Sequence, residues 1–185
     1  MTLPRRLGIL ALSAALVAAG SACGGNANAN AACNTDADLA ARQTLPIPPI
    51  LAGLTVSVDT KATSKIAKAA ASNSYVCNAM VFAMRDGKEL RAVLQVARLT
   101  PDARPGDPKF RRTIAGQIGG TSRRPEKIGD TLVYRARVNS QIIDIWFTGQ
   151  FMEVLIALES DTAGGTTIDF GRLLAEAISL RPIRV

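Results

Sequence analysis

Three alternating segments between Thr131 and Leu158 constrain the fold of this chain more than any other feature. Two-residue turns separate them, at Asn139-Ser140 and at Gly149-Gln150, where glycine in the first central position favours a type II′ turn. Alternation with a period of two predicts strands, and turns this short join antiparallel neighbours. The middle segment, Gln141 to Thr148, is apolar on both faces. The pattern therefore predicts an antiparallel meander with this middle strand inside the sheet.

A hairpin is predicted upstream of the meander. The segments Tyr75 to Met84 and Glu89 to Arg98 flank Asp86-Gly87, a dipeptide typical of the type I′ turn. In the second segment one set of side chains alternates with another: Leu90, Ala92, Leu94 and Val96 against Glu89, Arg91, Val93 and Gln95. This alternation predicts a sheet with one buried face and one solvated face.

Three helices are predicted, over Lys61 to Ser72, from Asp107-Pro108 to Gly119-Gly120, and after Thr166-Thr167. Asp107 is a good N-cap, and proline suits the first helical position. We expect Thr166-Thr167 to cap the last helix, because apolar residues then recur with helical spacing at Phe170, Leu173, Leu174, Ala177 and Ile178.

The predicted elements indicate an α+β fold. A further strand is expected at Leu54 to Asp59, an extended stretch at Pro46 to Ile50, and a short helix at Asp36 to Gln43. Hairpins joined through helices predict an antiparallel sheet of about five to six strands with its helices packed on one face.

The first 22 residues are typical of a secretory signal peptide. Arg5 and Arg6 precede an uncharged apolar run of 13 residues, Leu7 to Ala19, and small residues follow. A bilayer-spanning helix needs roughly 20 apolar residues. The run is therefore short for the alternative, a permanent membrane anchor.

Gly20-Ser21-Ala22-Cys23 resembles the bacterial lipobox, in which the cysteine becomes the lipid-modified first residue of the mature protein. The resemblance implies that Cys23 carries a diacylglyceryl thioether and an acylated amine, which hold the protein at the outer face of the cell membrane. Gly20 stands where the family usually has leucine, so ordinary secretion, with a cut near Ala27-Asn28-Ala29, is the alternative. In architecture alone, the chain also resembles small α+β lipoprotein domains of high-GC Gram-positive bacteria, including those with a PsbP-like sheet.

The other two cysteines predict one disulfide. Residues 23–32 carry no charge and no apolar periodicity, as expected of a flexible tether. Disulfides persist outside the cytoplasm, and Cys33 and Cys77 allow only one connectivity. We expect residues 33–185 to form a single domain that this bond pins to the tether. A reactive Cys77 is the alternative.

The sequence predicts no catalytic residue, no metal site and no cofactor. It contains no histidine, which excludes Ser-His and Cys-His nucleophile pairs and imidazole ligands. The G-x-S-x-G, S-x-x-K, Walker and G-x-G-x-x-G patterns are also missing from it. Glu159, Asp161 and Asp169 surround a Gly164-Gly165 loop, but they lack the ordered spacing of a calcium loop.

Asp144 and Glu153 are the carboxylates that come closest to a catalytic pair. Pairing around Gly149-Gln150 makes them diagonal neighbours on one face of the sheet. Two such acids could flank a sugar, as glycoside hydrolysis requires. The simpler interpretation is a solvated position near Arg135 or Arg137.

The net positive charge of the chain is local. From Cys23 onward there are 20 basic and 15 acidic side chains, and the segment from Arg104 to Lys127 contributes seven basic against two acidic. The whole excess of five charges therefore belongs to this segment. Its basic residues are Arg104, Lys109, Arg111, Arg112, Arg123, Arg124 and Lys127.

These features predict a membrane-tethered extracytoplasmic lipoprotein with a non-enzymatic, interaction or sensor-like domain. The basic segment is expected to contact a partner protein, an anionic polymer or lipid headgroups; a merely solvated helix face is the alternative. A second hypothesis is a carrier of lipid or another small hydrophobic ligand, with a cavity between sheet and helices. Nucleic acid is not an expected partner, because the chain is exported and only 4% aromatic.

Overall fold

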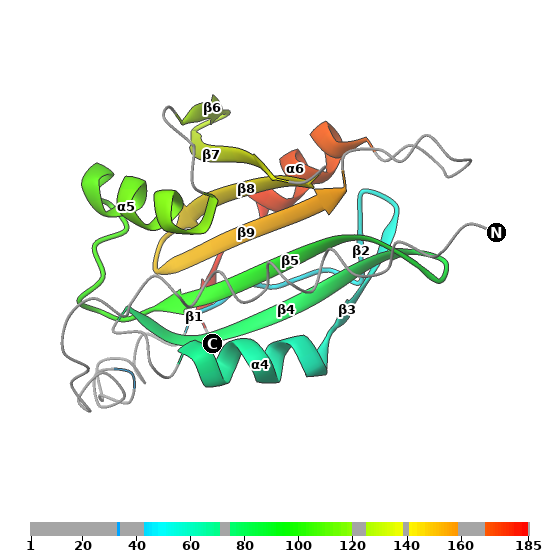
Figure 1. Cartoon of the computed structure of the whole chain (residues 1–185), viewed down its shortest axis with the longest axis horizontal. Coiled ribbons are helices and arrows are strands. Elements are labelled where there is room, and N and C mark those ends of the chain that lie inside the picture. Colours follow the sequence, from blue (N-terminus) through cyan, green and yellow to red (C-terminus); the bar gives the residue numbers. More distant parts are fainter. Residues whose placement is uncertain are drawn as a thin grey trace.

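Figure 1 shows the fold as a computed structural model, which describes residues 33, 43–70, 75–119, 125–138, 141–158 and 169–184. Within these residues, an open antiparallel sheet of eight strands carries three helices, and two further strands pair on their own. The predicted α+β class with an antiparallel sheet is confirmed. The expected count of five to six strands was wrong.

The sheet joins the two predicted hairpin regions side by side. Its order is β2-β3-β4-β5-β9-β8-β7-β6, so that β5 and β9 meet at the centre (Figure 1). The sheet strands are β2 Ile50–Leu51, β3 Leu54–Val58, β4 Val76–Asp86, β5 Glu89–Leu99, β6 Glu126–Ile128, β7 Thr131–Val138, β8 Gln141–Thr148 and β9 Phe151–Leu158. The separate pair is β1 Gln43–Thr44 with β10 Ile183–Arg184, and the helices are α4 Thr60–Ala70, α5 Pro108–Gly119 and α6 Phe170–Ser179.

The meander forms with the register that a two-residue turn predicts. Thr148 pairs with Phe151 around Gly149, whose φ of 57° belongs to the left-handed region that glycine tolerates. Asp144 consequently lies opposite Leu155, and Trp146 lies opposite Glu153. The prediction that β8 is an interior strand is confirmed, because it pairs with β9 on one side and β7 on the other.

The upstream hairpin forms, but its turn is shifted by one residue from the prediction. Asp86 pairs with Glu89, so the turn residues are Gly87 and Lys88, and it is Gly87 that takes the positive φ of 56°. A bulge between Met84 and Arg85 shifts the ladder beside this turn. Leu90 therefore packs against the same cluster as Val93. The predicted alternation had placed Leu90 on the same face as Ala92, which belongs to the other cluster.

Both faces of the sheet are buried, which corrects two expectations: helices on one face and a solvated second face. Ile66 of α4 and Ile114 of α5 pack in one cluster with Val93, Ile143 and Val154, and we call this side the α4–α5 face. The other side, the α6 face, is a second cluster. It includes Leu94, Trp146, Leu155, Leu173 and Leu174. In Figure 1, α6 lies behind the sheet.

Two of the helix starts can be compared with their predicted caps. The Asp107 carboxylate accepts a hydrogen bond from Lys109 N at 2.8 Å, as expected where α5 begins at Pro108. The N-cap of α6 is Asp169, whose side chain accepts from Arg172 N at 2.9 Å. The prediction that Thr166-Thr167 caps this helix was therefore wrong, and those threonines lie outside the described residues.

The two ends of the described chain are tied into the fold. The predicted disulfide is present, with the Cα atoms of Cys33 and Cys77 5.4 Å apart. A short helix was predicted from Asp36 to Gln43, but Gln43 pairs with Arg184 in the small β1–β10 sheet. Residues 36–42 lie outside the described part of the chain. The signal peptide, Cys23 and the tether lie there too. None of the described helices is long and apolar enough to cross a membrane.

Candidate functional site

The structure divides the predicted basic segment into three parts. Arg104, Lys109 and Arg112 are exposed on the loop before α5 and on its first turns, and we call these three the basic surface. Lys127 lies elsewhere, on β6 at the edge of the sheet, within 4.0 Å of Asp130. Arg123 and Arg124 lie outside the described residues. One contact region from Arg104 to Lys127 stays a prediction, because two of its residues lie outside the described part of the chain.

Backbone hydrogen bonds hold the basic surface in place. Ala103 N donates to Thr100 O at 3.0 Å, and Asp107 N donates to Arg104 O at 2.8 Å. The Ala103 side chain is buried, which anchors the loop on the protein. The Asp107 carboxylate then caps the helix that carries Lys109 and Arg112. Arg104 is thereby fixed beside the start of α5.

Arg111 belongs to the packing of this region and not to the basic surface. It is half-buried, and its Nε donates a hydrogen bond to Pro105 O. Its guanidinium carbon lies 5.7 Å from the centre of the Phe147 ring, within the range of a cation–π contact. Arg111 thus helps to fasten α5 to β8, and its role as a contact residue stays a prediction.

Sequence reasoning missed an aromatic row that runs from the surface into the core. Tyr75 is 41% exposed, and its ring meets that of Phe110 edge-on at 5.5 Å. Phe110 in turn lies 6.2 Å from Phe147, which is 6.5 Å from the buried Tyr134. The available signal was a tyrosine at the first position of a predicted strand, where an exposed ring is possible. The row connects the first turn of α5 to the α4–α5 face.

Tyr75, the disulfide and the loop before α5 share one end of the sheet. Thr100 N donates to Tyr75 O at 3.0 Å, and Leu99 N donates to Gln150 O at 2.8 Å. Cys77 Sγ is 3.8 Å from Leu99 O. We call this end of the sheet, with Tyr75, the disulfide and the loop before α5, the disulfide end. Figure 1 shows the start of β4, the end of β5 and α5 together on its left side.

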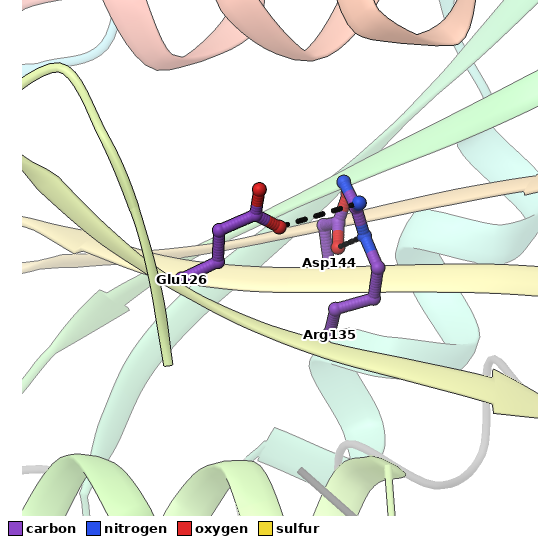
Figure 2. Close-up of polar contacts among 3 residues, drawn as sticks. All are labelled: Glu126, Arg135 and Asp144. Carbon is purple, nitrogen blue, oxygen red and sulfur yellow. Dashed lines mark hydrogen bonds and ion pairs between the residues drawn. The ribbon is translucent and has the colours of Figure 1, made fainter. Parts of the chain in front are cut away.

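The two candidate acids occupy the α6 face as diagonal neighbours, as the register predicted, but they are not solvated. Asp144 is 0% exposed and Glu153 is 1% exposed. The Asp144 carboxylate accepts two hydrogen bonds from Arg135, at 2.8 Å from Nε and 2.9 Å from Nη2. Figure 2 shows the same guanidinium reaching Glu126 of β6, at 3.4 Å from Nη1. Arg135 is therefore the partner of Asp144 that the sequence suggested.

Burial dominates the electrostatics of both acids. It raises the pKa of Asp144, while the hydrogen bonds and charge of Arg135 act against that rise. It raises the pKa of Glu153 to about 8, with smaller opposing contributions from hydrogen bonds at Thr148 and from the charge of Arg181. Glu153 is therefore mostly protonated at neutral pH.

Glu153 and Trp146 face each other across the β8–β9 ladder with unsatisfied polar atoms. Among the described residues, neither Glu153 Oε2 nor Trp146 Nε1 has a hydrogen-bond partner. Because Asp144 and Glu153 are both enclosed, they do not line a surface that a polysaccharide could reach. Their placement favours a role in stability and pH response.

The described part of the chain contains no group of three or more Cys, Asp or Glu residues arranged to hold a metal ion. No protein family, curated protein or solved structure matches the chain. The basic surface beside the disulfide is therefore the arrangement from which a function has to be argued.

Proposed function

We propose that this protein is a membrane-tethered extracytoplasmic domain that binds an anionic component of the cell envelope without enzymatic activity. The observation that carries the proposal is the position of the basic surface. Arg104, Lys109 and Arg112 are exposed at the end of the sheet where Cys33–Cys77 joins the preceding chain to the domain. In this proposal Cys23 carries the lipid, as its lipobox-like context implies.

The charge of this end supports binding at contact range. Residues 98–112 contain five basic and two acidic side chains, a net charge of +3. One of the acids, Asp107, is engaged in capping α5. At physiological ionic strength, exposed charges act over roughly 8 Å, so a ligand has to touch the surface to benefit. A basic side chain near an anionic membrane surface contributes about 1 kcal/mol.

The packing of the sheet supports an interaction module over the alternative hydrophobic carrier. The apolar residues on the two faces of β8 suggested either a core or a ligand cavity. Ile143 and Ile145 belong to the cluster under α4 and α5, and Trp146 belongs to the cluster under α6. A core on each side accounts for these residues.

A series of substitutions that neutralise basic side chains tests the binding function. The full-length protein, purified in neutral detergent, is titrated with poly-L-glutamate as a simple polyanion. Arg104→Gln/Lys109→Gln/Arg112→Gln is expected to weaken binding at least tenfold, since each lost contact is worth about 1 kcal/mol. The matched control, Lys61→Gln/Lys65→Gln/Lys88→Gln, removes three exposed charges from α4 and the β4–β5 turn and should bind like the parent. Equal binding by all three proteins would overturn the proposal.

The anchoring part of the proposal has its own test. Cys23→Ala should move the protein from the membrane fraction to the soluble fraction and abolish incorporation of a radiolabelled fatty acid. Fatty-acid labelling that persists in Cys23→Ala would show that Cys23 is not the lipidated residue.

A further inference from the structure

We propose that the disulfide end is a membrane-docking face, in which Tyr75 enters the headgroup layer of an anionic bilayer while the basic surface contacts the headgroups. This inference rests on the proposed function and names its ligand class. Three independent features of the described structure carry it: an oriented exposed aromatic ring, the charges around that ring, and the point where the tether joins the fold.

Tyr75 has the properties of an interfacial residue. It is one of the few large apolar side chains that stand out from the described surface, with 41% of its area exposed. The ring is held by Phe110 at an interplanar angle of 84°, so its orientation is set by packing. Tyrosine is enriched where membrane meets water, because its ring is apolar and its hydroxyl is polar. An exposed, oriented tyrosine is thus suited to the headgroup layer.

The basic side chains belong to the helix and the loop that contact Tyr75. Phe110, which supports the Tyr75 ring, directly follows Lys109 and precedes Arg112 by two positions on α5. Tyr75 O accepts a hydrogen bond from Thr100 N, at the start of the loop that carries Arg104. Tyr75 and the basic residues thus lie at the same end of the fold, and an aromatic residue combined with basic residues is what binds membranes with anionic lipids.

The tether directs the same end toward the membrane. Cys33 is bonded to Cys77, two positions from Tyr75. Cys33 follows Cys23 by ten positions, and a fully extended chain covers at most about 3.6 Å per position, or roughly 36 Å in all. A lipid on Cys23 therefore keeps the disulfide end within a short reach of the bilayer. This geometry favours lipid headgroups over a distant acidic protein as the ligand.

Docking depth can be measured on the full-length protein reconstituted through its own lipid. Tyr75→Trp places a fluorophore at the proposed contact, and lipids brominated near the headgroup quench it if it enters the bilayer. Trp146 is fully buried, so the parent protein measures the background from that residue. We expect at least twofold stronger quenching of Tyr75→Trp in vesicles of phosphatidylglycerol and phosphatidylcholine than in phosphatidylcholine alone. This difference in quenching should disappear when Tyr75→Trp is combined with Arg104→Gln/Lys109→Gln/Arg112→Gln. It should persist when Tyr75→Trp is combined with Lys61→Gln/Lys65→Gln/Lys88→Gln.

A second measurement leaves Tyr75 unchanged and covers the case in which its substitution disturbs the fold. Hydrogen–deuterium exchange of the parent protein should slow in residues 99–112 in the anionic vesicles only. Absence of both the quenching difference and the exchange difference would overturn the docking face. If poly-L-glutamate still binds through the basic surface in that case, the proposed function stands and its ligand is an acidic protein or polymer. If neither probe binds, both proposals fail.

Discussion

Glu153 is a carboxyl group whose burial makes the folded protein sensitive to pH. Its pKa is raised from 4.5 to about 8, mainly by loss of contact with water. Between these values the unfolded chain has released the proton while the folded chain keeps it. The contribution of Glu153 to stability is therefore greatest below pH 4.5 and falls as the pH rises toward about 8, by up to about 1.4 kcal/mol per unit.

Glu153→Gln should remove this slope. Glutamine keeps the shape of the protonated side chain and cannot ionise, so the free energy of unfolding should change little between pH 5 and pH 8.5, and at the upper end the variant should exceed the parent by several kcal/mol. Urea denaturation across that range measures the effect. Glu89→Gln, at an exposed position, is the control and should keep the slope of the parent. A slope that survives in Glu153→Gln would assign the pH response to another group.

The positions of the two acids could be predicted from the sequence, but their environment could not. The turn at Gly149-Gln150 set the register, and the register made Asp144 and Glu153 diagonal neighbours. Their burial depends on α6, which folds over this face from the far end of the chain. Polar residues on a strand ordinarily indicate a solvated face. Here the charge of Asp144 is balanced by Arg135, and Glu153 keeps its proton.

Arg135 connects four elements. It binds Asp144 of β8 and Glu126 of β6, and its guanidinium carbon lies 5.7 Å from the ring of Phe170 on α6. Arg135 itself is on β7, near the β6 edge of the sheet. A single side chain therefore helps hold a three-residue strand and the start of a helix against the body of the sheet.

Arg135→Met should destabilise the fold by about 2–4 kcal/mol, because it leaves the Asp144 carboxylate enclosed without its partner. This is below the roughly 3–5 kcal/mol of a fully buried pair, since one third of the Arg135 side chain is exposed. Arg135→Met/Asp144→Leu should recover part of the loss, because it removes the stranded charge. Chemical denaturation measures both. Arg137→Met, at an exposed position of the same strand, should change stability by less than about 1 kcal/mol. Equal effects of Arg135→Met and Arg137→Met would contradict the assignment.

Long alternating or periodic segments were predictable, and very short or bulged ones were not. The strands β7, β8 and β9 and the buried stripe of α6 matched their patterns. The strands β1, β2, β6 and β10 have two or three residues each, too few to show a period. The turn predicted at Asp86-Gly87 lies one residue further along, at Gly87-Lys88, and a bulge beside it shifts the ladder again.

At the scale of the whole molecule, the second buried face follows from the way in which the two hairpin regions join. The strands at the centre, β5 and β9, come from different hairpins, and no local pattern indicates that two hairpins will join edge to edge. Once joined, they form a sheet wide enough to carry α4 and α5 on one side and α6 on the other. The same fold separates basic residues of one sequence segment: Lys127 lies on the sheet edge, and Arg111 is half-buried beside Phe147.

The disulfide should contribute strongly to global stability. It closes a loop of 44 positions, for which chain-entropy reasoning gives about 4 kcal/mol. Cys33→Ser/Cys77→Ser should lower the free energy of unfolding by roughly 3–4 kcal/mol in oxidising buffer, measured by urea denaturation. The parent protein under reducing conditions should show the same loss. A double variant as stable as the oxidised parent would mean that the β1–β10 pair and the core hold the chain without the bond.

The Cys33–Cys77 bond also determines how the domain would carry mechanical load. Tension arriving along the chain before Cys33 passes through the sulfur atoms into the start of β4, bypassing the residues between the two cysteines. β4 is hydrogen-bonded to β5 along nearly its whole length. A pull along β4 must therefore shear many hydrogen bonds at once instead of opening them one after another. Drag on a surface-tethered protein would then leave β1, α4 and the segment around them unstrained.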